Sequence, residues 1–193
     1  MSTVHKQHMR LKRPSMLLAI TTLVLVHFTN AIAASEPVAI NVTGKIVDNT
    51  CTVDTNGSDL NPILVGVSAR DLKGVGTTLG KRDIKISLKD CGKDIDRGLV
   101  VTASGEPDTA DESGYAFKNA STGESAASGV GLQFYKSADR STPFMTNGNV
   151  TETISNLKEG DNTLTFAAAY VAIIAEPSAG DFSTTVNLKL DYQ

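Results

Sequence analysis

Apolar and polar residues alternate in five segments spread along this 193-residue chain, whereas helical periodicity is almost absent. Alternation with a period of two is typical of half-buried strands, because successive side chains of a strand point to opposite faces of the sheet. A further segment, residues 99–102, is a short run rich in β-branched residues. The alternating segments are residues 38–43, 84–91, 130–135, 164–170 and 186–192.

Turn-forming residues separate the predicted strands, as expected where Gly, Asn, Asp, Ser and Pro gather. The long stretch 105–129 is rich in small and acidic residues, and we expect loops there around a short strand near residues 115–117. Short strands with regular turns predict one antiparallel β-sandwich domain. The turn segments are residues 54–59, 73–76, 147–149, 159–162 and 177–180.

Residues 1–33 have the features of a secretory signal peptide rather than of a folded domain. Four basic residues and no acidic one precede the apolar run 16–26, and Ala31 and Ala33 supply the small residues that a signal peptidase needs. We therefore expect export and cleavage before Ala34. The apolar run is too short to span a bilayer stably, so a retained membrane anchor is disfavoured.

Removal of this leader changes the chemistry that the chain can perform. All three histidines lie in residues 1–33, and the remaining 14 basic and 21 acidic residues give a net charge of −7. An acidic protein without basic clusters is a poor partner for nucleic acids or anionic membranes. The chain also contains no Trp, which removes one common anchor of sugar-binding sites.

The composition also disfavours an enzyme. Without His or a free thiol, nucleophile–base pairs of the Ser-His or Cys-His type cannot form. Residues 54–59 partly resemble a calcium loop, but the glycine is misplaced and Val65 stands where a bidentate Glu is required. Loop carboxylates such as Asp108 and Asp111 are the remaining candidates for acid–base chemistry. We expect no catalytic residue, cofactor or metal.

The two cysteines, Cys51 and Cys91, both follow the expected cleavage site and lie 40 positions apart. An even number of cysteines in an exported protein is typical of a disulfide. Closing a loop of this length stabilises the folded state by roughly 3–4 kcal/mol on the chain-entropy model.

The strand predicted at residues 38–43 has two possible roles. It begins a few residues after the expected cleavage site, and the sequence stops within its last predicted strand, with Tyr192 as the penultimate residue. The N-terminal strand could be an ordinary edge strand of its own domain. It could equally be a strand lent to another protein, and the pattern alone does not choose between these roles.

Six segments in order make the chain resemble subunits of chaperone–usher pili, especially those of the type 1 fimbrial group. They include a glycine, an apolar pair, a cysteine and a valine in the first segment, and the strand that carries the second cysteine. The resemblance covers the whole mature chain. The segments are residues 44–53, 84–91, 126–134, 162–172, 179–180 and 186–193.

The resemblance implies an incomplete immunoglobulin-like sandwich of six strands that lacks its seventh strand. The resulting groove is filled first by a periplasmic chaperone and then, after passage through an outer-membrane usher, by the N-terminal extension of the next subunit. Residues 34–44 would be that extension and residues 45–193 the pilin domain. The implied disulfide would join the first strand to the strand ending at Cys91, beside the groove.

The donor role assigns a register to the extension. Val38, Ile40, Val42 and Gly44 share one parity and would face the acceptor. Burial of the three larger side chains contributes roughly 5–8 kcal/mol before ordering costs. Gly44 would let the donor lie close to its acceptor. The resemblance therefore favours a donor strand over an edge strand.

The resemblance also makes the C-terminal strand a border of the groove and the place where the chaperone engages. By parity, Val186, Leu188, Leu190 and Tyr192 should face the groove and the core. In its short extension before Gly44 the chain resembles the minor tip and adaptor subunits of this group more than its rod subunits, so the resemblance favours a minor subunit of an extracellular fimbria. A major rod subunit is the main alternative, and a self-sufficient adhesive module that binds through the loop at residues 106–128 is a further one.

Overall fold

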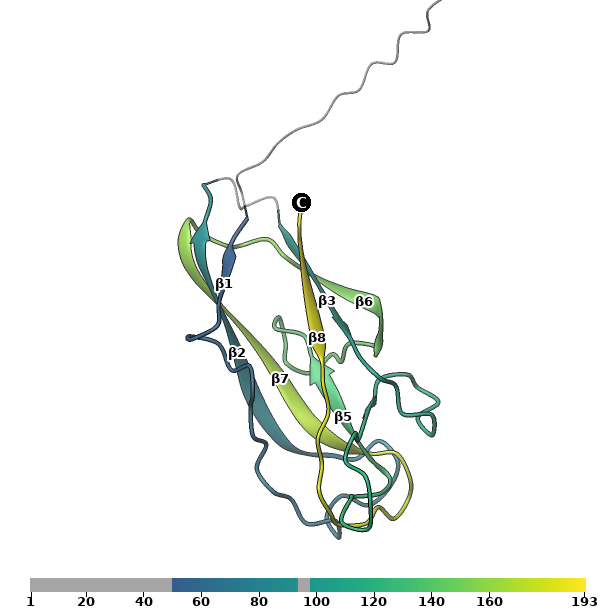
Figure 1. Ribbon diagram of the computed structural model, residues 1–193. Coiled ribbons are helices and arrows are strands. Elements are labelled where there is room, and N and C mark those ends of the chain that lie inside the picture. Colours follow the sequence, from purple (N-terminus) through teal and green to yellow (C-terminus); the bar gives the residue numbers. More distant parts are fainter. Residues whose placement is uncertain (1–49, 94–97) are drawn as a thin grey trace, which may run out of the picture. The chain divides into compact units, whose positions relative to one another are not determined.

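The computed structural model describes residues 50–93 and 98–193, and in these residues it contains strands and loops but no helix (Figure 1). Six of the described strands have six residues or more, and β1 and β4 are short edge pieces. No helix in the described part is long and apolar enough to cross a membrane. The strands are β1 (Thr52–Asp54), β2 (Thr78–Cys91), β3 (Leu99–Ser104), β4 (Phe117–Lys118), β5 (Val130–Tyr135), β6 (Asn147–Ile154), β7 (Gly160–Ala172) and β8 (Asn187–Tyr192).

The strands form two antiparallel sheets. The larger sheet has the order β1-β2-β7-β5-β4, and the smaller one has the order β6-β3-β8. β1 pairs with only one end of β2, from Thr52 opposite Lys89 to Asp54 opposite Ser87. Among the described strands β8 pairs with β3 alone, so it is an edge strand of the smaller sheet as described. The predicted all-β sandwich is confirmed. Two edges of it are incomplete: β1 covers only one end of β2, and β8 has a partner on one side only among the described strands.

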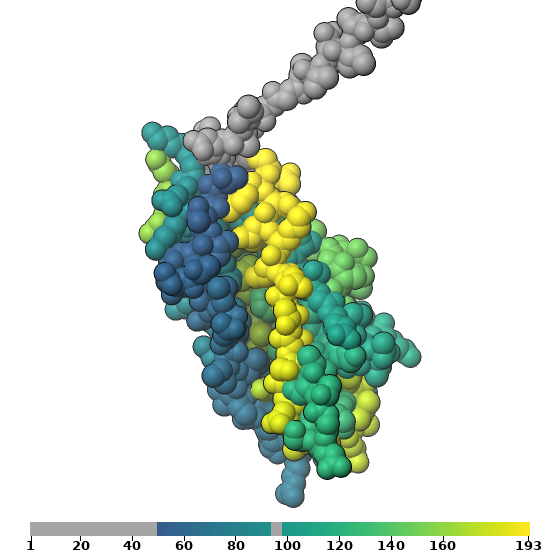
Figure 2. Space-filling view, in the orientation of Figure 1, coloured from purple at the N-terminus to yellow at the C-terminus, as the bar shows by residue number. Residues whose placement is uncertain are grey.

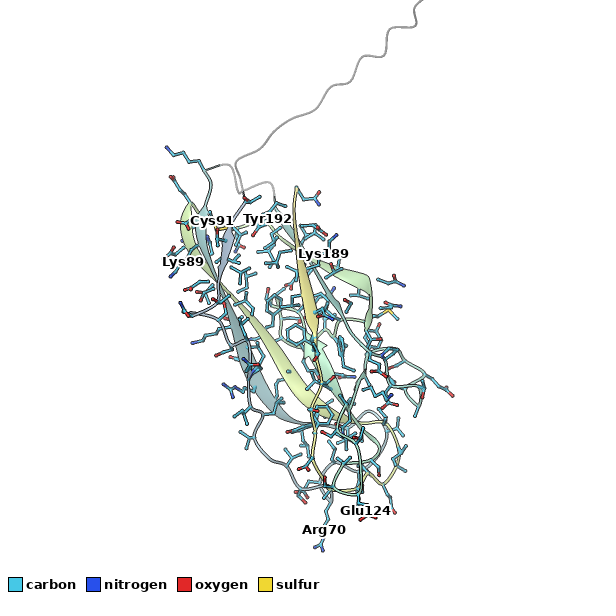
Figure 3. All side chains as sticks on the ribbon, in the orientation of Figure 1. Arg70, Lys89, Cys91, Glu124, Lys189 and Tyr192 are labelled. Carbon is cyan, nitrogen blue, oxygen red and sulfur yellow. A yellow bond between two sulfur atoms is a disulfide. The ribbon has the colours of Figure 1, made fainter. Side chains whose placement is uncertain are left out.

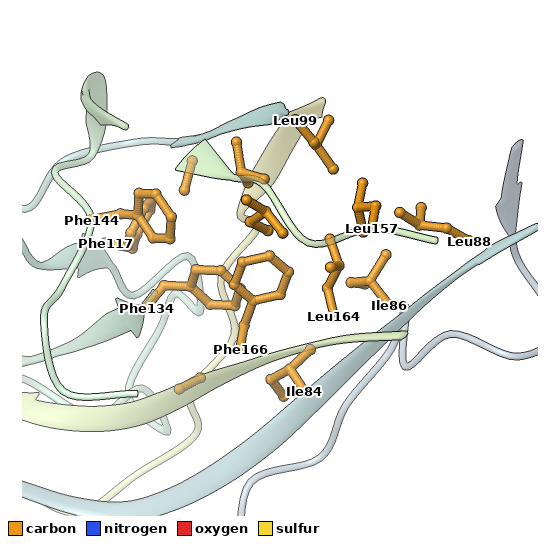
Figure 4. Close-up of a cluster of buried hydrophobic side chains, with 14 of the residues drawn as sticks. Ile84, Ile86, Leu88, Leu99, Phe117, Phe134, Phe144, Leu157, Leu164 and Phe166 are labelled. Atoms are coloured by element: carbon orange, nitrogen blue, oxygen red, sulfur yellow. The ribbon is translucent and has the colours of Figure 1, made fainter. Parts of the chain in front are cut away.

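The core is built from the apolar positions of the alternating segments. In β2, Ile84, Ile86 and Leu88 are buried, whereas Lys85 and Lys89 between and beyond them are exposed. The opposite sheet contributes the buried face of β3 (Figure 4). Three phenylalanine rings from β5, β7 and the β5–β6 connection pack with centroids 5.5–6.3 Å apart: Phe134, Phe166 and Phe144.

The sequence analysis missed β6 and placed a turn at residues 147–149, which is wrong because β6 begins at Asn147. In this strand Glu152 and Ile154 are both buried, so a charged residue occupies a core-facing position and interrupts the apolar alternation. The turn predicted at residues 159–162 is likewise too long, since β7 begins at Gly160. The predicted short strand near residues 115–117 corresponds to β4, shifted toward Lys118.

Candidate functional site

A groove of about 760 Å³ separates the two incomplete sheet edges. One wall is the segment after β1, residues 59–64, and the other is the C-terminal segment, residues 182–190. In Figure 2 these segments are the blue and yellow surfaces on either side of a hollow. Core side chains of β2, β5 and β7 form its floor. The floor residues are Ile84, Ile86, Leu132, Phe134, Ala168 and Tyr170.

The first wall has few hydrogen-bond partners. Asp59 is its last residue with a backbone hydrogen bond to β2, donating its N–H to the Lys85 carbonyl at 2.8 Å. Beyond that point, residues 61–67 make no backbone–backbone hydrogen bond with any described residue, although the Arg82 side chain donates to the Ile63 carbonyl. Ile63 is 81% exposed, which is unusual for such a large apolar side chain.

The second wall is a strand edge with one free side. Because β8 pairs only with β3 among the described strands, every second N–H and C=O of β8 points away from that partner. Val186, Leu188 and Leu190 are half-buried, pack against the main core and line the groove. The groove therefore presents apolar side chains together with main-chain groups that have no partner among the described residues.

The predicted disulfide between Cys51 and Cys91 is confirmed, and it lies toward one end of the groove without lining it, since Cys51 precedes the groove residue Val53 by two positions. Tyr192, the last of the residues predicted to face the groove and the core, packs against the core but is not among the groove-lining residues. It lies opposite Leu99 at the end of β8, and its hydroxyl donates to the Cys51 carbonyl at 3.3 Å (Figure 3). Burial raises the pKa of Tyr192. Tyr192 therefore makes a contact beside the disulfide and does not form part of the groove.

The other end of the groove contains an aromatic pair. The rings of Tyr170 and Phe182 meet edge to face, with centroids 5.3 Å apart. Tyr170 lies over Gly80, whose φ is +68°. A Cβ at Gly80 would come within 2.9 Å of Val67 and 3.1 Å of the Tyr170 ring, so a glycine is favoured under this ring both by its φ and by the space.

The charged groups near the groove serve to hold loops. The Asp54 carboxylate accepts from Lys89 at 2.9 Å, and this bond is the main reason that the pKa of Asp54 is lowered. The same carboxylate accepts the N–H of Asn56, so the segment that partly resembles a calcium loop is closed by its own side chains. Among the described residues, no group of three or more His, Cys, Asp or Glu could hold a metal.

The loop carboxylates considered for acid–base chemistry also have a structural environment. Asp111 accepts hydrogen bonds from Ser113, Tyr115 and Ala116 at 2.6–3.1 Å. Partial burial acts to raise the pKa of the Asp111 carboxyl, but these bonds outweigh it and lower the pKa.

The proposed donor positions Val38, Ile40, Val42 and Gly44 lie outside the described residues.

Sequence reasoning missed two polar residues with several hydrogen bonds: Asn119, which holds a wall of the groove, and Glu152, which lies outside the groove. Asn119 ties the loop before β5 to the groove wall at residues 181–183, and Glu152 holds the β5–β6 connection. Both act through partners that are distant in sequence or belong to loops. Periodicity carries no information about such contacts, because it reports only which face of an element is apolar.

Comparison with known proteins identifies the family. The family model described as "Fimbrial protein" matches residues 40–193. The S-fimbrial protein subunit SfaG of Escherichia coli O6:K15:H31 is 32% identical over 154 residues, which cover 80% of this chain and 82% of that protein. The fimbrial subunit ElfA of Escherichia coli K12 is 31% identical over 188 residues, which cover 93% of this chain and 99% of that protein.

Solved structures agree with this assignment. The antigen and type I fimbria protein of Burkholderia pseudomallei superposes with a TM-score of 0.54 at 33% identity, covering 76% of this chain and 91% of that one. The P pilus rod subunit PapA superposes with a TM-score of 0.59 over 74% of this chain and 99% of that one, and at 19% identity it supports the fold alone. The chain belongs to the fimbrial protein family and is an exported subunit of the chaperone–usher fimbriae that bacteria carry on their surface.

Proposed function

We propose that this subunit is built into its fimbria by donor-strand exchange and that its role is structural rather than catalytic. The observation that carries the proposal is the groove between residues 59–64 and β8, where a segment with few hydrogen bonds and a strand edge without a described partner flank core side chains of the larger sheet. An extended peptide laid between them gains main-chain hydrogen bonds, while its alternate side chains enter the apolar floor.

The alternation of side chains along the groove wall suits such a peptide. Side chains on one face of a strand are about 6.7 Å apart, since each residue rises about 3.3 Å. Val186, Leu188 and Leu190 follow this spacing along the groove wall. Apolar donor residues at every second position have the same spacing, so the two sets can interdigitate over the floor.

The proposed occupants are a periplasmic chaperone during export and the N-terminal extension of a neighbouring subunit in the fimbria. We assign residues 1–33 to a signal peptide, residues 34–44 to the extension that this subunit lends, and residues 45–193 to the pilin domain. In this arrangement each subunit acts once as donor and once as acceptor, and an outer-membrane usher is the place of exchange.

The donor role is tested by a matched pair of charge substitutions. Ile40→Asp puts a carboxylate on the face assigned to the acceptor, whereas Asn41→Asp puts the same charge on the opposite face. We expect the Ile40 variant, like a deletion of residues 34–43, to remain in the periplasm, and the Asn41 variant to reach sheared surface fimbriae. Equal incorporation of the two variants would refute the donor assignment.

The acceptor role is tested on β8 in the same way. Leu188 lines the groove, whereas its neighbour Lys189 is exposed and paired with Asp191 at 2.9 Å. Leu188→Gln removes an apolar groove contact and should weaken donor binding at least tenfold, about 1.4 kcal/mol, which is within the value of one buried leucine. Lys189→Gln should leave binding unchanged. A Leu188 variant that incorporates as well as the Lys189 variant would count against the acceptor groove.

We further propose a minor tip or adaptor position, on the basis of the short extension before Gly44. Quantitative mass spectrometry of isolated fimbriae gives the copy number directly. A few copies per fimbria would support a minor subunit, and a copy number that accounts for most of the fimbrial mass would establish the major rod subunit instead.

A further inference from the structure

The groove wall that leads into β8 is a long extended segment with little support from its own sheet. From Phe182 to Leu190, even-numbered residues are half-buried and odd-numbered residues are exposed, so the strand pattern begins five residues before β8. Residues 182–186 nevertheless lie outside the sheet ladder. Something other than β3 must hold this part of the wall in position.

Asn119 supplies that support. Its side-chain amide donates to the carbonyls of Ala127 and Asp181, each at 3.0 Å. Its amide oxygen accepts the N–H groups of Ser121 and Ser183, each at 3.0 Å. An asparagine side chain has two donor hydrogens and two acceptor lone pairs, so all four are used. Two of these bonds reach a segment more than 60 residues away in the sequence.

Ser183 is the single backbone anchor of residues 182–186 among the described residues. Its N–H donates to Asn119, and its carbonyl accepts the N–H of Ala120 at 2.7 Å. Next to it, Asp181 exchanges backbone hydrogen bonds with Ser125 and Ala127. Asn119 therefore takes the place that a neighbouring strand would hold on this side of the wall.

The hydrogen bonds of Ser183 also determine which main-chain groups of the wall face away from Asn119. In extended backbone, the N–H and C=O groups of adjacent residues point to opposite edges. Because those of Ser183 point toward Asn119 and Ala120, those of Phe182 and Thr184 point to the edge that continues the free edge of β8. The same anchor fixes Phe182, whose ring packs on Tyr170 at the end of the groove.

We propose that Asn119 is a positioning residue for donor-strand binding: it holds the 181–183 segment so that Phe182 and Thr184 are preset to pair with the incoming strand. This inference rests on the proposed acceptor groove. An unanchored wall must be ordered by the donor itself, and the apparent affinity falls in proportion to the fraction of molecules that are already ordered. Loss of the anchor should therefore weaken donor binding by about tenfold.

The test compares Asn119→Ala with Asn162→Ala in the exported protein. Asn162 also accepts one N–H and donates to two carbonyls, but all its partners lie within residues 158–160, away from the groove walls. A fluorescein-labelled peptide of residues 34–44, which stands for the extension of a second copy of this chain as the neighbouring subunit, is titrated by anisotropy. We expect parent-like affinity for the Asn162 variant and about tenfold weaker binding for the Asn119 variant, with similar thermal unfolding for both variants.

Amide hydrogen exchange in the unmodified protein provides a second readout that does not depend on a variant folding. Before the peptide is added, the Ser183 amide should be protected and those of Phe182 and Thr184 should exchange fast. Peptide binding should then protect both. A fast-exchanging Ser183 amide, or equal peptide affinities for the two variants, would overturn the proposed role of Asn119 but would leave the acceptor groove standing. No peptide binding to the parent protein would overturn the acceptor groove and this inference with it.

Discussion

Glu152 is a buried carboxylate on β6, and its replacement by glutamine gives a sharp test of the core. The residue is 6% exposed. Its two oxygens accept the Ser137 N–H at 2.9 Å, the Ser137 hydroxyl at 2.8 Å and the Ala138 N–H at 2.7 Å. The carboxylate thus fixes the connection that leads out of β5, at the edge of the smaller sheet.

Glu152→Gln keeps the size of the side chain but replaces one acceptor oxygen by a donor NH2 group. At least one of the three bonds is lost, and the new N–H faces groups that are themselves donors. A hydrogen bond to a charged group contributes about 1.5–3 kcal/mol, and a buried donor left without a partner costs about 1–3 kcal/mol. We therefore expect the free energy of unfolding to fall by about 3 kcal/mol.

Urea unfolding measures this change, with Glu106→Gln as the matched control. Glu106 pairs with Lys118 at 2.7 Å, but its side chain is 66% exposed, so the same chemical change should cost less than about 1 kcal/mol. Both midpoints are converted with a common slope, provided that the slopes agree. A Glu152 variant within about 0.5 kcal/mol of the Glu106 variant would refute the reasoning, since that difference is the usual size of a neutral surface change.

Two further changes test other parts of the structure. Replacing Cys51 and Cys91 together by Ala opens a loop with a sequence separation of 40 and should lower the free energy of unfolding by about 4 kcal/mol; a loss below about 1 kcal/mol in urea would contradict this. The pKa of Asp139 is lowered from 3.8 to about 2, first by the Thr142 hydroxyl, so its stabilising contribution is complete above pH 3.8 and is lost as the pH falls through about 2. Thr142→Val should move the Asp139 midpoint, followed by carboxyl-carbon NMR, up toward 3.8, and an unmoved midpoint would show that the hydroxyl is not the cause.

The sequence predicted those strands in which one face is apolar throughout. Ile84, Ile86 and Leu88 alternate with polar residues and are buried in β2, because the face they share covers the core. β6 was not predicted, because its core-facing side is not apolar throughout. Its core-facing position at Glu152 is charged, and the three hydrogen bonds from the β5–β6 connection make that burial tolerable.

The groove could be predicted only in part. Parity put Val186, Leu188 and Leu190 on one face, and the structure places them along a groove wall. The continuation of that wall to Phe182 was missed because Ser183 and Thr184 interrupt the apolar pattern. The bonds that hold it come from Asn119, more than 60 residues away, and local sequence does not encode such pairings.

The central claim is that the groove between residues 59–64 and β8 receives a strand from another subunit. Electron cryo-microscopy of fimbriae that contain this chain tests it most directly. The account predicts an extended segment of a neighbouring subunit in the groove, hydrogen-bonded to the free edge of β8, with alternate apolar side chains over Ile86, Leu132 and Phe134. An empty groove, or one filled by the chain's own N-terminal residues, would contradict it.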